Sequence, residues 1–149
     1  MQKTGKMPIH AVCKEEHIMA DHPNAALHRR AHEAFSSQDM DTLIQLIAED
    51  TVWHIPGRNQ LSGDLIGRDA VLGFFQRAGE LSEGTLVIAE EHDFLGSDDH
   101  SVALFRVTAE RNGKTLEGNL IEVVHWRDGQ MSENWHAVGD QYAWDEFWS

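Results

Sequence analysis

The last third of the chain alternates apolar and polar residues as β-strands do. Four runs rich in Val, Ile, Leu, Phe and Trp cover Thr85–Leu95, Ser101–Arg111, Thr115–Arg127 and Gln130–Val138. Asn112-Gly113 and Asp128-Gly129 stand between successive runs, and such pairs supply the positive φ angles of two-residue hairpin turns. We therefore predict a four-stranded antiparallel meander, one face of which other elements must cover.

The front of the chain has the spacing of amphipathic helices. From Pro23, apolar residues recur at three- and four-residue intervals through Phe35 and predict a first helix, with Asp21 as its candidate cap. A second, shorter helix begins at Met40 and is expected to end near Glu49-Asp50. A third begins at Arg68 or Asp69.

Between the second and third helices the pattern changes twice. Thr51–Ile55 is strand-like and is closed by Pro56-Gly57, whereas Arg58–Gly67 is predicted to be a loop. The order helix, helix, short strand, helix, four strands predicts an α+β fold, with three helices on one face of a curved sheet. A strongly twisted sheet covered in this way encloses a cone whose mouth stays open. Such a cavity is the usual form of a small-molecule site.

Composition narrows the possible classes of protein. The 149 residues, 41% hydrophobic and 25% charged, predict one globular domain at residues 21–149, preceded by an extension at residues 1–20 without clear periodicity. A net charge of −13 argues against nucleic acid or an anionic membrane surface as a partner. Cys13 is the only cysteine, which excludes an internal disulfide. No signal peptide or membrane-spanning run is visible, so a cytoplasmic location is the expectation.

Four short motifs suggest a family. They are Ser37-Gln38-Asp39-Met40-Asp41, Ala48–Trp53, Gly67–Val71 and Asp128–Trp135. Together with the order of elements, they resemble the cone-shaped NTF2-like superfamily, which contains nuclear transport factor 2, ketosteroid isomerase and the SnoaL-like polyketide cyclases. The resemblance implies a homodimer through the outer sheet face. It does not specify an activity, because this fold hosts isomerases, cyclases, dehydratases and non-enzymatic binders.

Two residues are candidates for proton transfer across the cone. The resemblance places His54 where the isomerases carry their proton-transferring carboxylate, and a neutral imidazole could do the same work. It places Glu122 where they keep a protonated carboxylic acid, with a pKa raised by desolvation. Glu122 shares a strand face with Leu120, Val124 and Trp126, which favours an inward side chain. A surface histidine and a solvent-facing glutamate are the alternatives.

The last strand carries two further candidates. Asp140 resembles the acidic residue that the cyclases place at the end of this strand, although its spacing from Trp135 leaves its direction open. His136 has the same parity as Asp140 and could pair with it or with Glu122. The alternative is a histidine–carboxylate pair that only ties the C-terminal segment to the sheet.

Aromatic and apolar residues are the candidates for contact with a ligand. The expected set is Phe35, Phe74, Val124, Trp126 and Tyr142, the last folded back over the mouth of the cone. The aromatic run that ends at Trp148 is expected to dock onto the mouth or onto a second subunit, because it would otherwise be exposed to water. By resemblance, Ala31 replaces the catalytic tyrosine of the isomerases, so steroid isomerisation of that type is not expected.

A metal site and a cofactor are not expected. His28 and His32 have the i, i+4 spacing of metal ligands, but they lie beside Arg29 and Arg30 and fit a solvated helix face better.

Two functional classes are compatible with these residues. The first is a cofactor-independent acid–base enzyme of isomerase, cyclase or dehydratase type, acting on a hydrophobic carbonyl-bearing or cyclic metabolite. In it, His54 is the base, and Glu122 or Asp140 is the acid. The alternative is a non-catalytic module of the same fold that binds a ligand or a partner protein.

Overall fold

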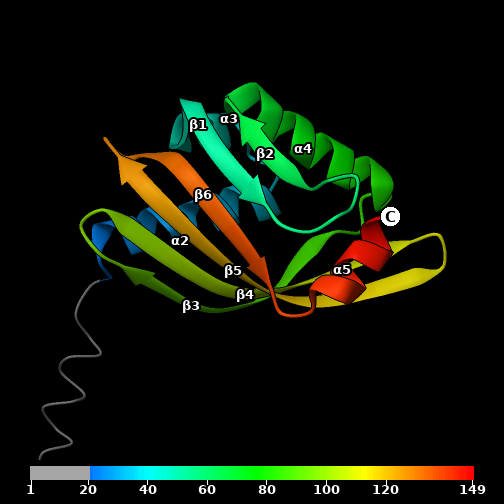
Figure 1. The fold of residues 1–149 in the computed structure, drawn as a ribbon. Coiled ribbons are helices and arrows are strands. Elements are labelled where there is room, and N and C mark those ends of the chain that lie inside the picture. Colours follow the sequence, from blue (N-terminus) through cyan, green and yellow to red (C-terminus); the bar gives the residue numbers. More distant parts are fainter. Residues whose placement is uncertain (1–20) are drawn as a thin grey trace, which may run out of the picture.

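Six strands form one twisted sheet in the order β2-β1-β6-β5-β4-β3 (Figure 1). The computed structural model describes residues 21–149, so the predicted extension at residues 1–20 lies outside the described residues. The strands are β1 Ile47–Ile55, β2 Gly63–Ile66, β3 Val87–Gly96, β4 His100–Arg111, β5 Lys114–Arg127 and β6 Gln130–Val138. Neighbouring strands are antiparallel except β1 and β6, which run parallel.

The hairpin turns close the meander, and the register of β5 against β6 then shifts by one residue between His125 and Trp126. Asn112 and Gly113 have φ angles of 50° and 76°, and Asp128 and Gly129 have φ angles of 53° and 75°. Two consecutive residues with positive φ match the twist of the flanking strands, so each pair closes a two-residue loop. The four predicted strands and both turns are thereby confirmed.

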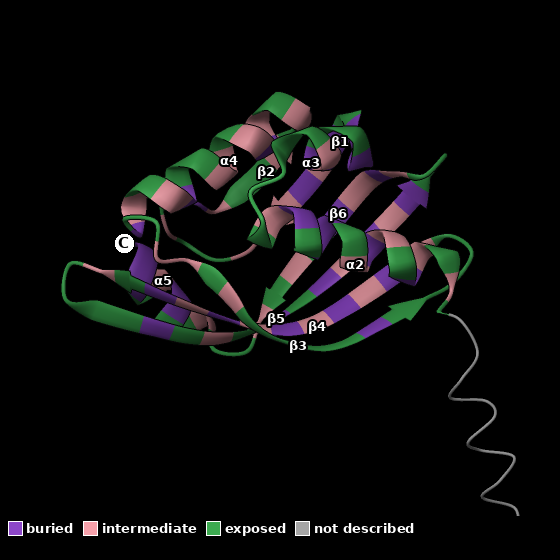
Figure 2. Ribbon diagram, turned by 180° about the vertical axis from the view of Figure 1, so that it is seen from behind, coloured by how far each residue is buried: buried purple, intermediate pink, exposed green. Residues whose placement is uncertain are grey.

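Within the described part of the chain, four helices accompany the sheet: α2 Pro23–Ser36, α3 Met40–Leu46, α4 Arg68–Leu81 and α5 Gln141–Trp148. The first three lie on one face of the sheet, as predicted. Figures 1 and 2 show the molecule from opposite directions, so the arrangement can be followed from both sides. Buried and less buried residues alternate along β4 and β5 (Figure 2), because successive side chains point to opposite faces. The α+β architecture expected from the sequence is confirmed.

Local chemistry sets the ends of these helices. At α2 the His22 ring, and not Asp21, accepts the backbone N–H of Asn24 at 3.1 Å. At α3 the Asp39 carboxylate accepts the N–H of Thr42 at 3.1 Å. This helix ends at Leu46, earlier than predicted, because Ile47 already has extended backbone angles and begins β1.

Two elements were not predicted. Strand β2 lies within the expected loop and pairs antiparallel with β1, where Leu65 lies opposite Trp53. Four residues are too few to show an alternating pattern. Helix α5 contains the aromatic tail, and its buried residues Trp144, Phe147 and Trp148 follow helical spacing. No helix between residues 21 and 149 is long and apolar enough to cross a membrane.

The two edges of the sheet are irregular or short. Strand β3 shifts register against β4 twice, between Ile88 and Glu90 and between Glu91 and Asp93. The opposite edge, β2, has only four residues. On the outer face, Ile121 and Trp135 are exposed. A homodimer through this face stays a prediction.

Candidate functional site

A cavity of about 790 Å³ lies between the concave face of the sheet and the helices. Phe35 of α2 and Phe74 of α4 line it, as expected from the sequence. Trp144 of α5 also lines it, and the packing of this helix against β5 accounts for the predicted docking of the aromatic tail. The volume is in the range of pockets that hold small organic molecules.

Several polar side chains meet at Glu122 in the wall of the cavity. This residue of β5 lies directly opposite His136 of β6 in the sheet register, and both side chains point into the cone. Glu122 is only 7% exposed, and its Oε1 lies 3.7 Å from Nε2 of His136. The Asn134 side chain donates a hydrogen bond of 3.2 Å to the same oxygen. The inward direction predicted for Glu122 and His136 is confirmed, and their catalytic roles stay predictions.

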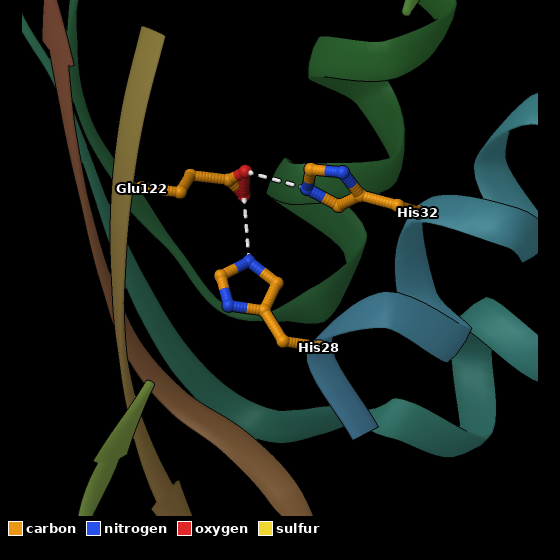
Figure 3. A group of neighbouring side chains, drawn as sticks. All are labelled: His28, His32 and Glu122. Carbon is orange, nitrogen blue, oxygen red and sulfur yellow. Dashed lines mark hydrogen bonds and ion pairs between the residues drawn. The ribbon is translucent and has the colours of Figure 1, made fainter. Parts of the chain in front are cut away.

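Helix α2 brings two histidines to the same carboxylate (Figure 3). His28 and His32 are one turn apart, and their rings meet edge to face with centroids 5.1 Å apart. His28 Nε2 lies 3.9 Å from Oε1 of Glu122, and His32 Nε2 lies 3.4 Å from Oε2. One ring nitrogen from each histidine and one carboxylate oxygen lie within 4.8 Å of one another, which is close enough to hold a metal ion together.

The opposite side of each ring also faces a polar group. His28 Nδ1 lies 2.8 Å from the Ser101 hydroxyl, which in turn accepts the indole N–H of Trp126 at 2.7 Å. This contact orients the His28 ring with Nε2 toward Glu122. His32 Nδ1 lies 3.6 Å from a carboxylate oxygen of Glu91 but makes no hydrogen bond with a described residue.

The charges of the cluster follow from burial and from its neighbours. Burial acts to raise the pKa of the Glu122 carboxyl, but His136 and the two histidines of α2 outweigh it, so this pKa lies well below its ordinary value. Burial lowers the pKa of His136, although Glu122 opposes this effect. An ionised carboxylate beside a neutral imidazole is therefore the state at neutral pH. The predicted rise in the pKa of Glu122 is wrong.

His54 does not face the cavity, so its predicted position opposite Glu122 is wrong. Trp53 takes the cavity side of β1, and alternation along the strand turns His54 to the outer face. There its ring stacks on Trp135 at 5.7 Å and lies between two carboxylates, 2.8 Å from Asp64 and 2.7 Å from Glu133. His54 and Glu122 therefore do not share a site.

Four further expectations need correction. Asp140 is exposed and accepts the backbone N–H of Ala143 at 3.1 Å, so it caps α5 and does not reach the cavity. The chain turns at Gly139, after the strand has ended, so the alternation of side chains between the two faces of β6 does not extend to Asp140. Tyr142 is 91% exposed and does not cover the mouth. Val124 and Trp126 do point inward, but they are buried in the core beside the cavity and do not line it.

His28 and His32 are the residues that sequence reasoning misjudged. Both are buried, whereas a solvated helix face was expected. They share the inward face of α2 with small residues, among them Ala25 and Ala31, which leave room for the rings. The i, i+4 spacing was the correct signal. The neighbouring arginines misled because they lie on other sides of the helix.

Comparison with known proteins identifies the family and agrees with the fold. Residues 28–134 match the family model of the SnoaL-like domain. An uncharacterized protein of Mycobacterium tuberculosis, Rv0034, is 30% identical over 131 residues, which is 88% of this chain and all of that protein.

Among solved structures, Bal32a from a soil-derived mobile gene cassette is 39% identical, with a TM-score of 0.81 over 85% of this chain and 96% of that chain. TerC, co-crystallized with polyporic acid, is 18% identical, with a TM-score of 0.73 over 85% of this chain and 98% of that chain. Other structures that share the fold are described as candidate polyketide cyclases. The family model covers well over half of the chain, and the chain therefore belongs to the SnoaL-like domain family.

Proposed function

We propose that this protein binds a hydrophobic cyclic or carbonyl-bearing metabolite in the cone and transfers a proton on it through His136 and Glu122. One observation carries the proposal: a carboxylate and an imidazole, 3.7 Å apart, stand together in an otherwise largely apolar cavity of about 790 Å³. Few polar groups in an apolar pocket are typical of sites that bind and orient small molecules.

The proposed chemistry needs only one proton and the groups already in place. A C–H bond next to the carbonyl breaks, its proton passes to the His136 imidazole, and the electron pair moves onto the carbonyl oxygen as an enolate. The proton then returns to the same carbon or to another one. Glu122 stabilises the imidazolium in the meantime through its negative charge, 3.7 Å from Nε2. His54 and Asp140 have no part in this proposal.

The comparisons support a small-molecule ligand. TerC has been crystallized with polyporic acid, so a protein of this fold takes up a small organic compound. Candidate polyketide cyclases with the same fold are compatible with acid–base chemistry on a cyclic substrate. The alternative is a protein that only binds its ligand. The missing tyrosine at Ala31 favours it, because that position of the cavity wall offers no hydrogen-bond donor.

The test uses 1-tetralone, a bicyclic ketone, in heavy water, with deuterium uptake at the carbon beside the carbonyl followed by NMR. The wild-type protein should accelerate uptake over buffer. His136→Ala and Glu122→Gln should each lose about 10²- to 10⁴-fold of that acceleration. His54→Ala is the matched control and should keep it, because this histidine lies on the other face of the sheet.

Binding of 1-tetralone is measured separately by quenching of tryptophan fluorescence, since Trp53 and Trp144 line the cavity. Binding without faster uptake would support the non-catalytic alternative. Uptake that persists unchanged in His136→Ala would refute the proposed roles.

A further inference from the structure

We propose that His28, His32 and Glu122 form a site for a divalent transition-metal ion, with Zn²⁺ as its first candidate. Two ligands come from successive turns of α2 and the third from the facing strand β5, so the ion would join the helix to the sheet (Figure 3). This inference does not rest on the proposed proton transfer, although Glu122 takes part in both and only His136 is specific to the proton transfer. It replaces the expectation that the protein uses no metal.

The distances fit an ion after a small movement of the side chains. Zinc bonds to nitrogen and carboxylate oxygen are about 2.0–2.2 Å long, so ligand atoms around one ion lie roughly 3–3.5 Å apart. His32 Nε2 and Glu122 Oε2 are already 3.4 Å apart, and His28 Nε2 and Glu122 Oε1 are 3.9 Å apart. The three donor atoms all lie within 4.8 Å of one another, so an ion would draw them together by up to about 1–2 Å.

The surroundings of the two rings resemble those of metal-bound histidines. In metal sites the ring nitrogen that does not bind the ion usually contacts a carboxylate, a hydroxyl or a carbonyl, which fixes the direction of the other nitrogen. Here Nδ1 of His28 contacts Ser101, which directs its Nε2 at Glu122. Nδ1 of His32 lies 3.6 Å from the Glu91 carboxylate, too far for a hydrogen bond, while its Nε2 lies 3.4 Å from Glu122.

Two ring nitrogens of the proposed ligands have no hydrogen-bond partner within residues 21–149, Nε2 of His28 and Nδ1 of His32. His28 is 0% exposed, and its Nε2 lies on the side of Glu122. A buried polar atom without a partner is unfavourable, and an ion bound to Nε2 of His28 would remove that cost. Hydrogen bonding alone therefore leaves the cluster incomplete.

The ligand set favours particular ions and leaves room for a substrate. Two imidazoles and one carboxylate suit Zn²⁺, Co²⁺, Ni²⁺ or Fe²⁺ better than Mg²⁺ or Ca²⁺, which prefer oxygen. Three protein ligands leave at least one coordination position open, as in catalytic zinc sites. His32 and Glu122 line the cavity, so the open position would face a bound molecule. A bound ion would polarise a substrate oxygen there.

The experiment starts from the full chain after removal of metal with EDTA. Calorimetric titration with ZnCl₂ should show one equivalent bound, and CoCl₂ should give visible absorption bands of a Co²⁺ ion with few ligands. His28→Gln and His32→Gln should each weaken zinc affinity by at least about 100-fold. Mutating a residue that only contacts a metal ligand typically weakens affinity by about 10- to 100-fold, and loss of the ligand itself should weaken it more. Glu122→Gln should do the same.

A surface control is needed because the outer face also carries histidines. His100 and His125 lie 3.1 Å apart there, and His125→Ala should leave stoichiometric binding unchanged. Binding lost in His125→Ala but kept in His32→Gln would show surface uptake and overturn the proposal. Absence of zinc and cobalt binding by the wild-type protein would overturn it as well, whether or not the variants fold.

The failure of this proposal is distinguishable from failure of the proposed function. Deuterium uptake into 1-tetralone by the EDTA-treated protein tests His136 without any ion present. Uptake in the absence of metal binding would leave the proton transfer standing and remove the metal site. Metal binding without uptake would do the reverse.

Discussion

Replacement of Trp148 by alanine should strongly destabilise the protein, although this residue is near the end of the chain. Trp148 is 1% exposed and packs edge to face against Phe147, with ring centroids 4.7 Å apart. A buried aromatic side chain covers about 150–250 Å², which corresponds to roughly 4–6 kcal/mol at about 25 cal/mol per Å². Its indole N–H has no hydrogen-bond partner among the described residues. Burial of this unpaired group is unfavourable by about 1–3 kcal/mol, which reduces the stabilisation from the buried area.

The expected net loss for Trp148→Ala is therefore about 3 kcal/mol, at the lower end of the range for such truncations. In a domain of this size it lowers the melting temperature by about 6–12 °C. The matched control is Tyr142→Ala on the same helix, which should change stability by less than about 0.5 kcal/mol because Tyr142 is exposed. Both are measured by urea unfolding at equilibrium and by thermal melting. Equal, small losses in the two variants would refute the packing of α5 described above.

Three further predictions concern single contacts. Asp140→Ala should cost about 1 kcal/mol in urea unfolding because α5 loses its N-cap, whereas Asp140→Asn should retain most of the stability. Hydrogen bonds to Glu133, and secondarily to Asp64, raise the pKa of His54 in the folded protein. Protonated His54 therefore stabilises the fold fully below its pKa in the unfolded chain, near 6.5, and this stabilisation is lost as the pH rises through the folded-state pKa. Urea unfolding from about pH 6 to pH 9 should show that loss in the wild type and not in His54→Gln; identical pH profiles would exclude it. Gly57→Ala should lower the melting temperature measurably, because φ is +98° and a Cβ would collide with Asp145.

The fold was largely predictable because its signals are local. The Asn-Gly and Asp-Gly pairs determine two turns, and alternation along β5 correctly placed Glu122 inside the cone. The same rule failed to orient His54, because only the packing of Trp53 against the cavity decides which side of β1 is inward. Strand β2 escaped detection, since four residues carry too little pattern.

The site was only partly predictable because it is assembled across elements. His136 meets Glu122 only because the register of β5 against β6 shifts by one residue between His125 and Trp126, whereas the turn at Asp128 alone would place Trp135 opposite Glu122. His28 and His32 reach Glu122 through the packing of α2 on the sheet, and residue type alone favoured a solvated position for them. The direction of the pKa shift of Glu122 depends on these histidines, so desolvation by itself predicted the wrong sign.

The irregular edges of the sheet bear on how copies of the chain can associate. Unpaired strand edges are templates for strand addition and aggregation. Strand β3 is bent by two register shifts and carries the exposed acidic residues Glu90, Glu91 and Asp93, while β2 is too short to recruit a long partner strand. Growth of a continuous intermolecular sheet is thereby disfavoured at both ends, even in concentrated solution.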